Sequence, residues 1–265
     1  MAIIDISEHN SKVKIKTLRD KYSIEGVIIR YSWGNFTKDK QADRFISECL
    51  ENNMPFSFYH FSYSRSYKDA LDAAKKFVNS IKDYNISYPA VVDIESDPWK
   101  TQRGVTFKDE ADVIRAWRDV FNSYGMRLMV YLNSNYYNNL LKVDSSLFNG
   151  LDIWIANWSK EPNDINYYLW QYTSSYNYEG VRLDANQKGP AFKLYNNNYE
   201  NEEQIDTPFK SGDLVTFNNL GDDRLGKPFT YNTYEVIGVT KEGYVNLGIK
   251  GRYVATTDAY RLMEV

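Results

Sequence analysis

Short apolar runs alternate with amphipathic stretches over residues 1–190, and this alternation restricts the possible folds more than any other feature of the chain. Near-continuous apolar runs are typical of strands that are buried on both faces, and apolar residues at helical spacing predict covering helices. The predicted strands are residues 3–7, 26–32, 55–63, 90–95, 127–132, 152–156, 168–172 and 181–185. The predicted helices are residues 12–21, 41–52, 66–81 and 109–124. This order predicts an α/β fold with a parallel sheet, and eight strands suggest that the sheet closes into a barrel.

The last part of this region departs from the alternation. About 11 residues separate strands six and seven, and about 8 separate strands seven and eight. A parallel crossover needs about a dozen residues or more, usually with a helix. We therefore expect the last three strands to lack covering helices and to include an antiparallel pair, so that the barrel is incomplete.

The sequence changes character after residue 190. Residues 191–209 are rich in Asn and acidic residues and poor in aliphatic ones, which is typical of a linker. Residues 210–265 contain short β-rich runs separated by Asn, Gly and Asp turn signals, and these runs predict a small β-barrel. The predicted strands are residues 213–218, 233–240, 243–249 and 252–256. The predicted organisation is thus a barrel domain (1–190), a linker (191–209) and a small all-β domain (210–265).

Charge and composition exclude several classes of function. Residues 1–190 carry 24 basic and 24 acidic groups and residues 210–265 carry 7 of each, so neither part is a basic nucleic-acid surface. No apolar run approaches 18 residues, which argues against a membrane span. The first residues lack a basic leader and a small-residue cleavage site, so we expect no secretory signal. The single cysteine, Cys49, lies on an apolar helix face and is expected to be a buried thiol.

Four acidic residues fall on predicted strands. Asp93 and Glu95 directly follow the apolar run 89–92, and side chains at positions i and i+2 of a strand point to the same face, with Cα atoms about 6–7 Å apart. Asp5 lies in strand one and Asp184 near the end of strand eight, and these strands become neighbours when a barrel closes. We expect the four carboxylates to meet at one mouth of the barrel. Crowding raises the pKa of one acid while another stays ionised, as acid–base cleavage of a glycosidic bond requires.

The same four acids could instead hold Mg²⁺ or Ca²⁺. A metal phosphohydrolase would also need groups that bind phosphate, and no Gly-rich loop before a helix accompanies the acids. Two histidines and one cysteine leave too few ligands for a usual zinc site. We therefore expect no metal and no cofactor, and an activity that survives EDTA.

Several motifs, taken in their order and spacing, resemble family 25 of the glycoside hydrolases, the lysozyme-type N-acetylmuramidases of phage endolysins and bacterial autolysins. The resemblance covers about residues 2–188. Its motifs are Ile4-Asp5-Ile6-Ser7-Glu8-His9-Asn10, Val27-Ile28-Ile29-Arg30, Tyr59-His60-Phe61, Ala90-Val91-Val92-Asp93-Ile94-Glu95, Tyr131 with Asn133, Leu151-Asp152-Ile153-Trp154-Ile155-Ala156-Asn157-Trp158, Leu169-Trp170-Gln171-Tyr172-Thr173 and Val181-Arg182-Leu183-Asp184-Ala185-Asn186. It implies an incomplete barrel of five βα units followed by three strands.

The resemblance also implies roles for individual residues. Glu95 matches the general acid, and Asp93 matches the acid that assists attack at the anomeric carbon or orients the acetamido group of the substrate. Asp5 and Asp184 match the acids that flank this pair. The positions that match sugar subsites are Tyr59, Tyr131, Trp158 and Gln171. Strand two departs from one common version of the family, because Arg30-Tyr31-Ser32-Trp33-Gly34 stands where Lys-Ala-Thr-Glu-Gly is frequent. No residue of this chain is therefore assigned the role of that Glu.

The implied activity is cleavage of the β-1,4 bond between N-acetylmuramic acid and N-acetylglucosamine in peptidoglycan. A chitinase-like or N-acetylglucosaminidase activity is an alternative, and so is a wall-binding protein without activity. An i, i+2 acid pair falls between the carboxyl spacings of retaining and inverting glycosidases, which leaves room for a substrate-assisted route. Residues 210–265 contain Gly212-Asp213-Leu214-Val215, Tyr234-Glu235-Val236 and Tyr260-Arg261-Leu262. With these motifs they resemble bacterial SH3-type domains that bind cell walls. Because we expect no secretory signal, an endolysin that resides in the host cytoplasm until a holin releases it to the cell wall fits better than a secreted autolysin.

Overall fold

The computed structural model describes residues 2–96, 98–193 and 195, except for the side chains of residues 99 and 101, together with the backbone of five strands between residues 214 and 261. The strands of the first part are β1 (Ile3–Ile6), β2 (Gly26–Gly34), β3 (Thr37–Lys38), β4 (Phe56–Ser62), β5 (Ala90–Asp93), β6 (Leu128–Asn133), β7 (Asp152–Ala156), β8 (Leu169–Tyr178) and β9 (Val181–Lys188). Its helices are the 3₁₀ turn η1 (Glu8–Asn10), α1 (Ile15–Tyr22), α2 (Ala42–Glu51), α3 (Tyr67–Ile81), α4 (Pro98–Gln102), α5 (Phe107–Ser123) and α6 (Ser134–Val143).

Eight of these strands form a closed barrel. The sheet order is β1-β9-β8-β7-β6-β5-β4-β2, with the small strand β3 beside β2, and a parallel pairing of β1 with β2 closes the ring. Neighbours from β2 round to β8 also pair in parallel, whereas β9 is antiparallel to both β8 and β1. The eight predicted strands and the antiparallel pair among the last three are confirmed. Strand β3, a two-residue partner of β2, was not predicted.

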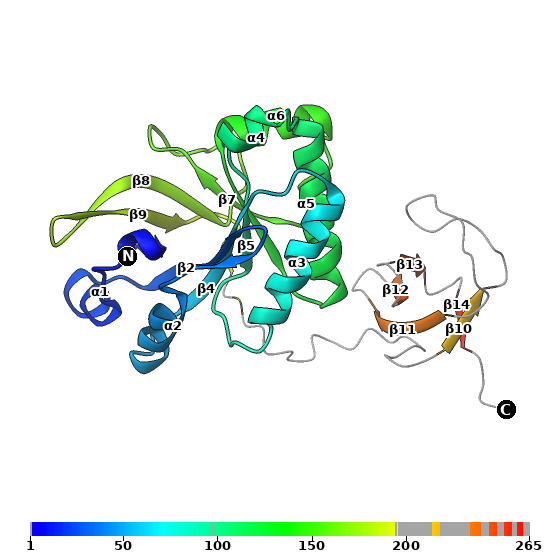
Figure 1. The fold of residues 1–265 in the computed structure, drawn as a ribbon, viewed down its shortest axis with the longest axis horizontal. Helices are drawn as coiled ribbons and strands as arrows, with labels where there is room; N and C mark the ends of the chain where they lie inside the picture. The colour runs from blue at the N-terminus through cyan, green and yellow to red at the C-terminus, as the bar shows by residue number, and fades with distance from the viewer. Residues whose placement is uncertain are drawn as a thin grey trace. The chain divides into compact units, whose positions relative to one another are not determined.

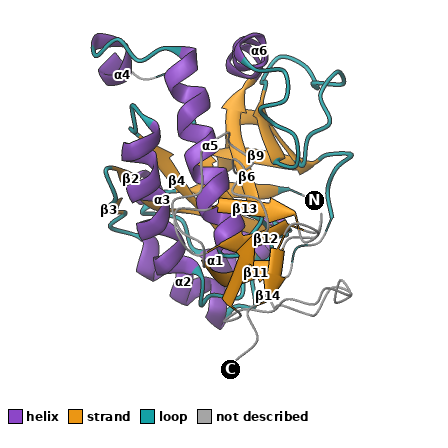
Figure 2. Ribbon diagram, turned by 90° about the vertical axis from the view of Figure 1, so that its right-hand side faces the viewer, coloured by secondary structure: helices purple, strands orange, loops and turns teal. Residues whose placement is uncertain are grey.

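Helices cover the outside of the barrel on the side of its first strands. Figures 1 and 2 show α3 and α5 running side by side over the strands. Within the described residues no helix lies between β7 and β8 or between β8 and β9, as the short connections predict. The last two strands meet at a tight turn in which Glu179 and Gly180 have φ of 48° and 82°, the left-handed pair that a two-residue hairpin requires.

Helix α6 was not located from apolar periodicity, although five βα units imply a helix after β6. Only Leu140 of its residues is buried, so its apolar face is too narrow to stand out in the sequence. Its start has a clear chemical cause, because the Asn133 side chain accepts a hydrogen bond from the Tyr136 backbone N–H at 2.9 Å. The short helix α4 was also not predicted.

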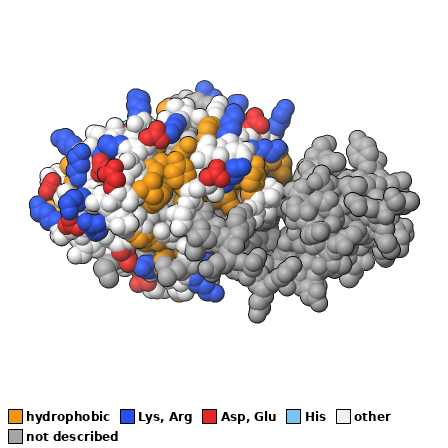
Figure 3. All heavy atoms as spheres, turned by 90° about the horizontal axis from the view of Figure 1, so that it is seen from below, with side chains coloured by type: hydrophobic (Ala, Val, Ile, Leu, Met, Phe, Trp, Pro, Cys, Tyr) orange, Lys and Arg blue, Asp and Glu red, His pale blue; other side chains and the backbone are white. Residues whose placement is uncertain are grey.

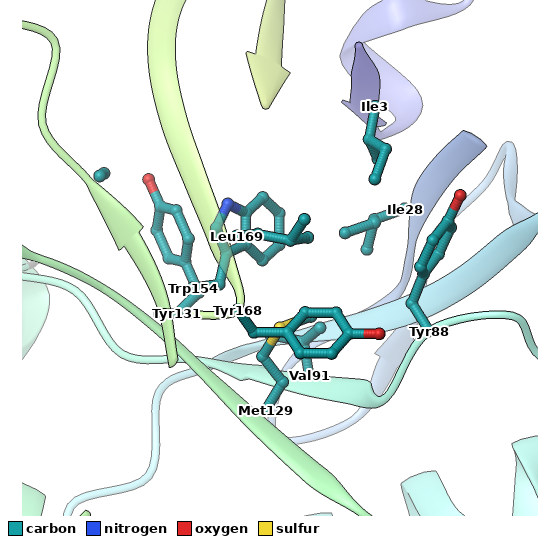
Figure 4. Close-up of a cluster of buried hydrophobic side chains, with 10 residues drawn as sticks. Ile3, Ile28, Tyr88, Val91, Met129, Tyr131, Trp154, Tyr168 and Leu169 are labelled. Carbon is teal, nitrogen blue, oxygen red and sulfur yellow. The ribbon is translucent and has the colours of Figure 1, made fainter. Parts of the chain in front are cut away.

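Large side chains fill the barrel interior and leave one end open. Figure 4 shows residues from several strands pointing toward one another in this core. Tyr88 and Tyr168 close the end where the parallel strands begin, and the Phe192 ring packs on Tyr168 with ring centroids 4.8 Å apart. Cys49 is fully buried on α2, and burial raises the pKa of its thiol to about 12, which confirms the expected buried thiol. The polar residues that remain inside gather at the opposite end.

The described residues of the C-terminal part form strands alone. These are β10 (Leu214–Phe217), β11 (Tyr234–Val239), β12 (Tyr244–Leu247), β13 (Arg252–Ala255) and β14 (Ala259–Arg261). They pair antiparallel in the order β13-β12-β11-β10-β14. The first four coincide with predicted strands, and β14 is additional. Most of the predicted linker, from residue 196 to residue 209, lies outside the described residues.

Across the described residues, no helix combines the length and the apolar character that a membrane crossing demands.

On the face of the first part drawn in Figure 3, Asp and Glu side chains lie among the Lys and Arg side chains rather than beside one basic patch. This surface agrees with the equal numbers of basic and acidic groups in residues 1–190.

Candidate active site

The four predicted acids line one cavity of about 270 Å³ at the open end of the barrel. Asp5 lies in β1, Asp93 ends β5, and Glu95 follows two residues later. Asp184 reaches the cavity differently from the prediction. Strand β9 runs antiparallel to its neighbours, so Asp184 faces the cavity from within that strand rather than from a carboxyl end. The other residues lining the cavity are Ser7, His9, Asn10, Arg30, Tyr59, Phe61, Tyr131, Trp154 and Gln171.

Asp5 and Asp184 form one carboxyl pair. They are directly opposite in the antiparallel ladder, which directs both side chains to the same face with Cβ atoms about 4.5–5.5 Å apart. Burial, followed by the charge of Asp184, raises the pKa of Asp5 to about 8. Burial also raises the pKa of Asp184. This pair therefore holds a proton at neutral pH.

Two amides hold Asp5 in place. Its Oδ2 accepts hydrogen bonds from Asn186 Nδ2 at 2.8 Å and from Gln171 Nε2 at 3.2 Å. Asn186 is fully buried and also accepts a hydrogen bond from Trp154 Nε1 at 2.7 Å. No role was predicted for Asn186. The signal was present, because Asn186 lies two residues after Asp184 on the same strand and therefore on the same face.

Asp93 and Glu95 form the second carboxyl pair, here called the strand-five dyad. Asp93 is 6% exposed. Burial, followed by the charge of Glu95 and a hydrogen bond between the two side chains, raises the pKa of Asp93 well above its usual range, while Lys100 acts in the opposite direction. Asp93 Oδ1 is buried and has no hydrogen-bond partner within the described part of the chain. The dyad thus shares a proton, and one buried oxygen of Asp93 is an unused acceptor.

Gln171 connects the floor of the cavity to its rim. Its Oε1 accepts hydrogen bonds from Tyr131 OH at 3.0 Å and from Trp158 Nε1 at 3.1 Å, while its Nε2 donates to Asp5. Both polar atoms of the side chain are therefore engaged within the protein. Such an arrangement suits a residue that orients its neighbours, and a direct contact of Gln171 with substrate stays a prediction.

Aromatic side chains surround the acids. Tyr59 and Tyr131 both line the cavity and contact the Trp154 ring, with centroid separations of 6.4 Å and 4.6 Å. Trp158 lies beside the cavity and is 61% exposed, although its indole nitrogen is fixed by Gln171. An exposed ring held in one orientation offers a flat apolar surface to a sugar.

A basic residue of the cavity was not assigned a role from the sequence. Arg30 lies in β2, donating from Nε to Asp39 at 2.8 Å and from an Nη to Glu8 at 3.0 Å.

In the described part of the chain, no group of three or more His, Cys, Asp or Glu side chains could hold a metal ion.

A second hollow, of about 370 Å³, lies beside α1 and the hairpin of β8 and β9. It is lined by Ala2, Tyr22, Ser23, Tyr172, Tyr176 and Gln187. None of these residues carries a carboxylate, so this hollow lacks the acid–base groups that the barrel mouth brings together.

Comparison with known proteins agrees with this geometry. The sequence profile described as glycosyl hydrolases family 25 matches residues 4–181, which include Asp5, Asp93 and Glu95, and Asp184 lies just beyond its end. A comparison with curated proteins found no match. Among solved structures, the modular autolysin LytC from Streptococcus pneumoniae is 27% identical with a TM-score of 0.62, covering 70% of this chain and 46% of LytC. This chain therefore spans about half the length of that autolysin.

Two further solved structures share the fold. A family 25 glycosyl hydrolase from Bacillus anthracis is 19% identical with a TM-score of 0.61, covering 77% of this chain and 90% of that chain. The catalytic domain of endolysin ply40 from bacteriophage P40 of Listeria monocytogenes is 20% identical with a TM-score of 0.59, covering 72% of this chain and 93% of that chain. Since the family profile spans more than half of the residues, the chain belongs to glycosyl hydrolase family 25.

Proposed function

We propose that this glycoside hydrolase is an N-acetylmuramidase, which cleaves the β-1,4 bond between N-acetylmuramic acid and N-acetylglucosamine in peptidoglycan. The observation that carries the proposal is the pairing of four carboxyl groups around one cavity, in which the pKa of Asp5 is raised to about 8 and that of Asp93 is raised well above its usual range. The similar pneumococcal autolysin has a structure in complex with a synthetic peptidoglycan ligand, which favours this substrate over chitin.

In the proposed mechanism Glu95 is the general acid that protonates the leaving oxygen. Asp93, which lines the cavity, accepts a hydrogen bond from the acetamido N–H of the substrate. That hydrogen bond favours the ionised form of Asp93 and leaves the shared proton on Glu95. The acetamido carbonyl oxygen then attacks the anomeric carbon as its bond to the leaving oxygen breaks. Water next adds to the anomeric carbon, the carbon–oxygen bond of the new ring breaks, and the proton of the water passes to Glu95, which restores the acid. Asp5 and Asp184 share one proton, so the pair keeps one negative charge that stabilises the developing cation.

The cleaved bond and its stereochemistry test the proposal. Mass spectrometry of digested cell walls is expected to find each new reducing end on N-acetylmuramic acid. Reducing ends on N-acetylglucosamine would favour the glucosaminidase alternative, and no new ends would favour a wall-binding protein without activity. Proton NMR of the first-formed sugar is expected to show retained configuration, since the acetamido route involves two displacements. An inverted product would rule out that route.

We also propose that Trp158 forms a sugar subsite. Replacing Trp158 with Ala is expected to remove about 1 kcal/mol of substrate binding, seen as a roughly fivefold higher KM with little change in kcat. Trp158→Phe is the matched control, because it keeps an apolar ring but removes the N–H that binds Gln171. If Phe behaves like Ala, the hydrogen bond to Gln171 rather than the ring surface accounts for the effect.

We further propose that residues 210–265 are an SH3-type domain that holds the enzyme on the cell wall, and that the protein is an endolysin released from the host cytoplasm through a holin. Support comes from the five antiparallel strands. A chain ending at residue 198 is expected to lose at least about 10²-fold in wall affinity, because tethering no longer adds to substrate binding. Cleavage of soluble glycan fragments should persist. The cut lies beyond Phe192 and Lys193, since both contact Tyr168 in the barrel.

A further inference from the structure

A buried ion pair lies behind the strand-five dyad. Lys100 of α4 and Glu110 of α5 are 2% and 1% exposed, and Lys100 Nζ lies 3.1 Å from Glu110 Oε1. Removing two charges from water costs more than packing apolar side chains of similar size in the same place. Stability alone therefore gives little reason for this pair.

Lys100 also contacts the segment that carries Glu95. Its Nζ donates to the Glu95 backbone carbonyl at 3.4 Å. Glu95 follows the end of β5, where the strand ladder no longer fixes the chain. One further backbone bond, from Ile94 N to the Tyr131 carbonyl at 2.9 Å, supports this segment. The ammonium thus holds the backbone of the proposed general acid, and Lys100 is not among the residues that line the cavity.

The charges around the dyad come from several elements. Asp5 of β1 adds to the raised pKa of Asp93 when it is itself ionised, and the Lys100 ammonium lowers that pKa. The Tyr59 and Tyr131 phenols, from β4 and β6, are neutral because burial raises their pKa values well above the usual range.

His60, which lies close enough to Lys100 to be affected by its charge, adds no positive charge of its own. His60 of β4 is fully buried, and burial lowers its pKa to about 3, so it is neutral. Its ring stacks on Trp117 of α5 with centroids 5.1 Å apart. Glu110 Oε2 has no described hydrogen-bond partner, so the carboxylate depends on Lys100 for its neutralisation.

We propose that Lys100, anchored by Glu110, is a positioning residue that fixes the Glu95 backbone and supplies the positive charge needed by one ionised carboxylate of the dyad. The inference rests on the proposed function, in which the dyad works with one shared proton. Without Lys100, both ionisations of the dyad become less favourable. The acidic limb of the bell-shaped kcat/KM profile reports the ionisation of the base, and the basic limb reports the loss of the proton from the acid. Both limbs therefore move to higher pH.

The double variant Lys100→Met/Glu110→Leu separates this role from a structural one. Replacing a buried ion pair by apolar side chains is often neutral or stabilising, so Tm should stay near that of the wild type. Activity on cell walls is expected to fall at least roughly tenfold in kcat, with both limbs shifted upward by about one pH unit. A double variant with wild-type kcat and an unshifted profile overturns the inference.

Two further variants complete the experiment. Lys100→Gln keeps a donor for the Glu95 carbonyl but removes the charge, so it should show the pH shift. If the double variant does not fold, Lys100→Gln decides, and an unshifted profile overturns the inference. Arg127→Gln, which breaks the ion pair with Asp152 where β6 and β7 begin, should leave the profile unchanged. A wild-type protein that releases no muramic reducing ends would instead refute the proposed function, independently of these variants.

Discussion

Replacing Glu95 with Gln is expected to slow the clearing of cell-wall suspensions by about 10²–10⁴-fold, which is the usual effect of losing a general acid. Gln has nearly the same shape as Glu and cannot transfer a proton, so the substrate should still bind. The measurement combines turbidity clearing with a wall pull-down of the same sample. Clearing should collapse while the fraction of protein bound to walls stays at the wild-type level.

The control is Glu25→Gln. Glu25 lies at the opposite end of the barrel, where it pairs with Lys188, and this change should leave clearing unaffected. Loss of clearing in Glu95→Gln counts only when thermal unfolding shows that the variant is folded. Clearing at the wild-type rate would remove Glu95 from the mechanism and transfer the role of acid to Asp93 or Asp5, whose pKa values are raised.

The sequence predicted those features that depend on local patterns. Apolar runs located all eight barrel strands, and the closure of a barrel was enough to bring Asp5 beside Asp184. The direction of each strand was harder to predict, because an apolar run has the same pattern in both directions. Strand β9 is antiparallel to both of its neighbours, β1 and β8. Helix α6 was missed because one buried leucine does not produce a periodic face.

The supporting residues of the site were harder to predict than the acids. Lys100 and Glu110 lie on different helices, and α4 has too few residues to show a buried face. A lysine in such a segment is usually exposed. Nothing in the local pattern shows that it meets a carboxylate ten positions later. Pairings of this kind depend on how the chain after β5 folds back, which is a tertiary property.

The second large effect concerns stability, because the pKa of Asp5 is raised to about 8 in the folded protein against 3.8 as its ordinary value. Between these two values the folded state binds one proton more than the unfolded state. Stability therefore falls as pH rises, by about 1.4 kcal/mol for each pH unit. The contribution is fully present below about pH 4 and is lost as pH rises through about 8.

Replacing Asp5 with Asn removes this ionisation. The Asn oxygen can still accept from Gln171 and Asn186, and its NH₂ group can donate to Asp184 as the protonated acid does. Asp5→Asn is therefore expected to have a higher Tm than the wild type at pH 8, by the equivalent of several kcal/mol, and the same Tm at pH 4. Its activity should fall, since the amide cannot share a proton with Asp184.

Thermal unfolding across this pH range measures the difference, and Asp144 provides a control of opposite sign. Hydrogen bonds from Arg115 and Ser146 lower the pKa of Asp144 to about 2, so its contribution is present above its ordinary pKa and is lost as pH falls through about 2. Asp144→Asn should therefore destabilise the protein more at pH 8 than near pH 2. A constant Tm difference between Asp5→Asn and the wild type from pH 4 to 8 would mean that Asp5 ionises normally. The Asp5–Asp184 pair would then lack the shared proton that the mechanism assigns to it.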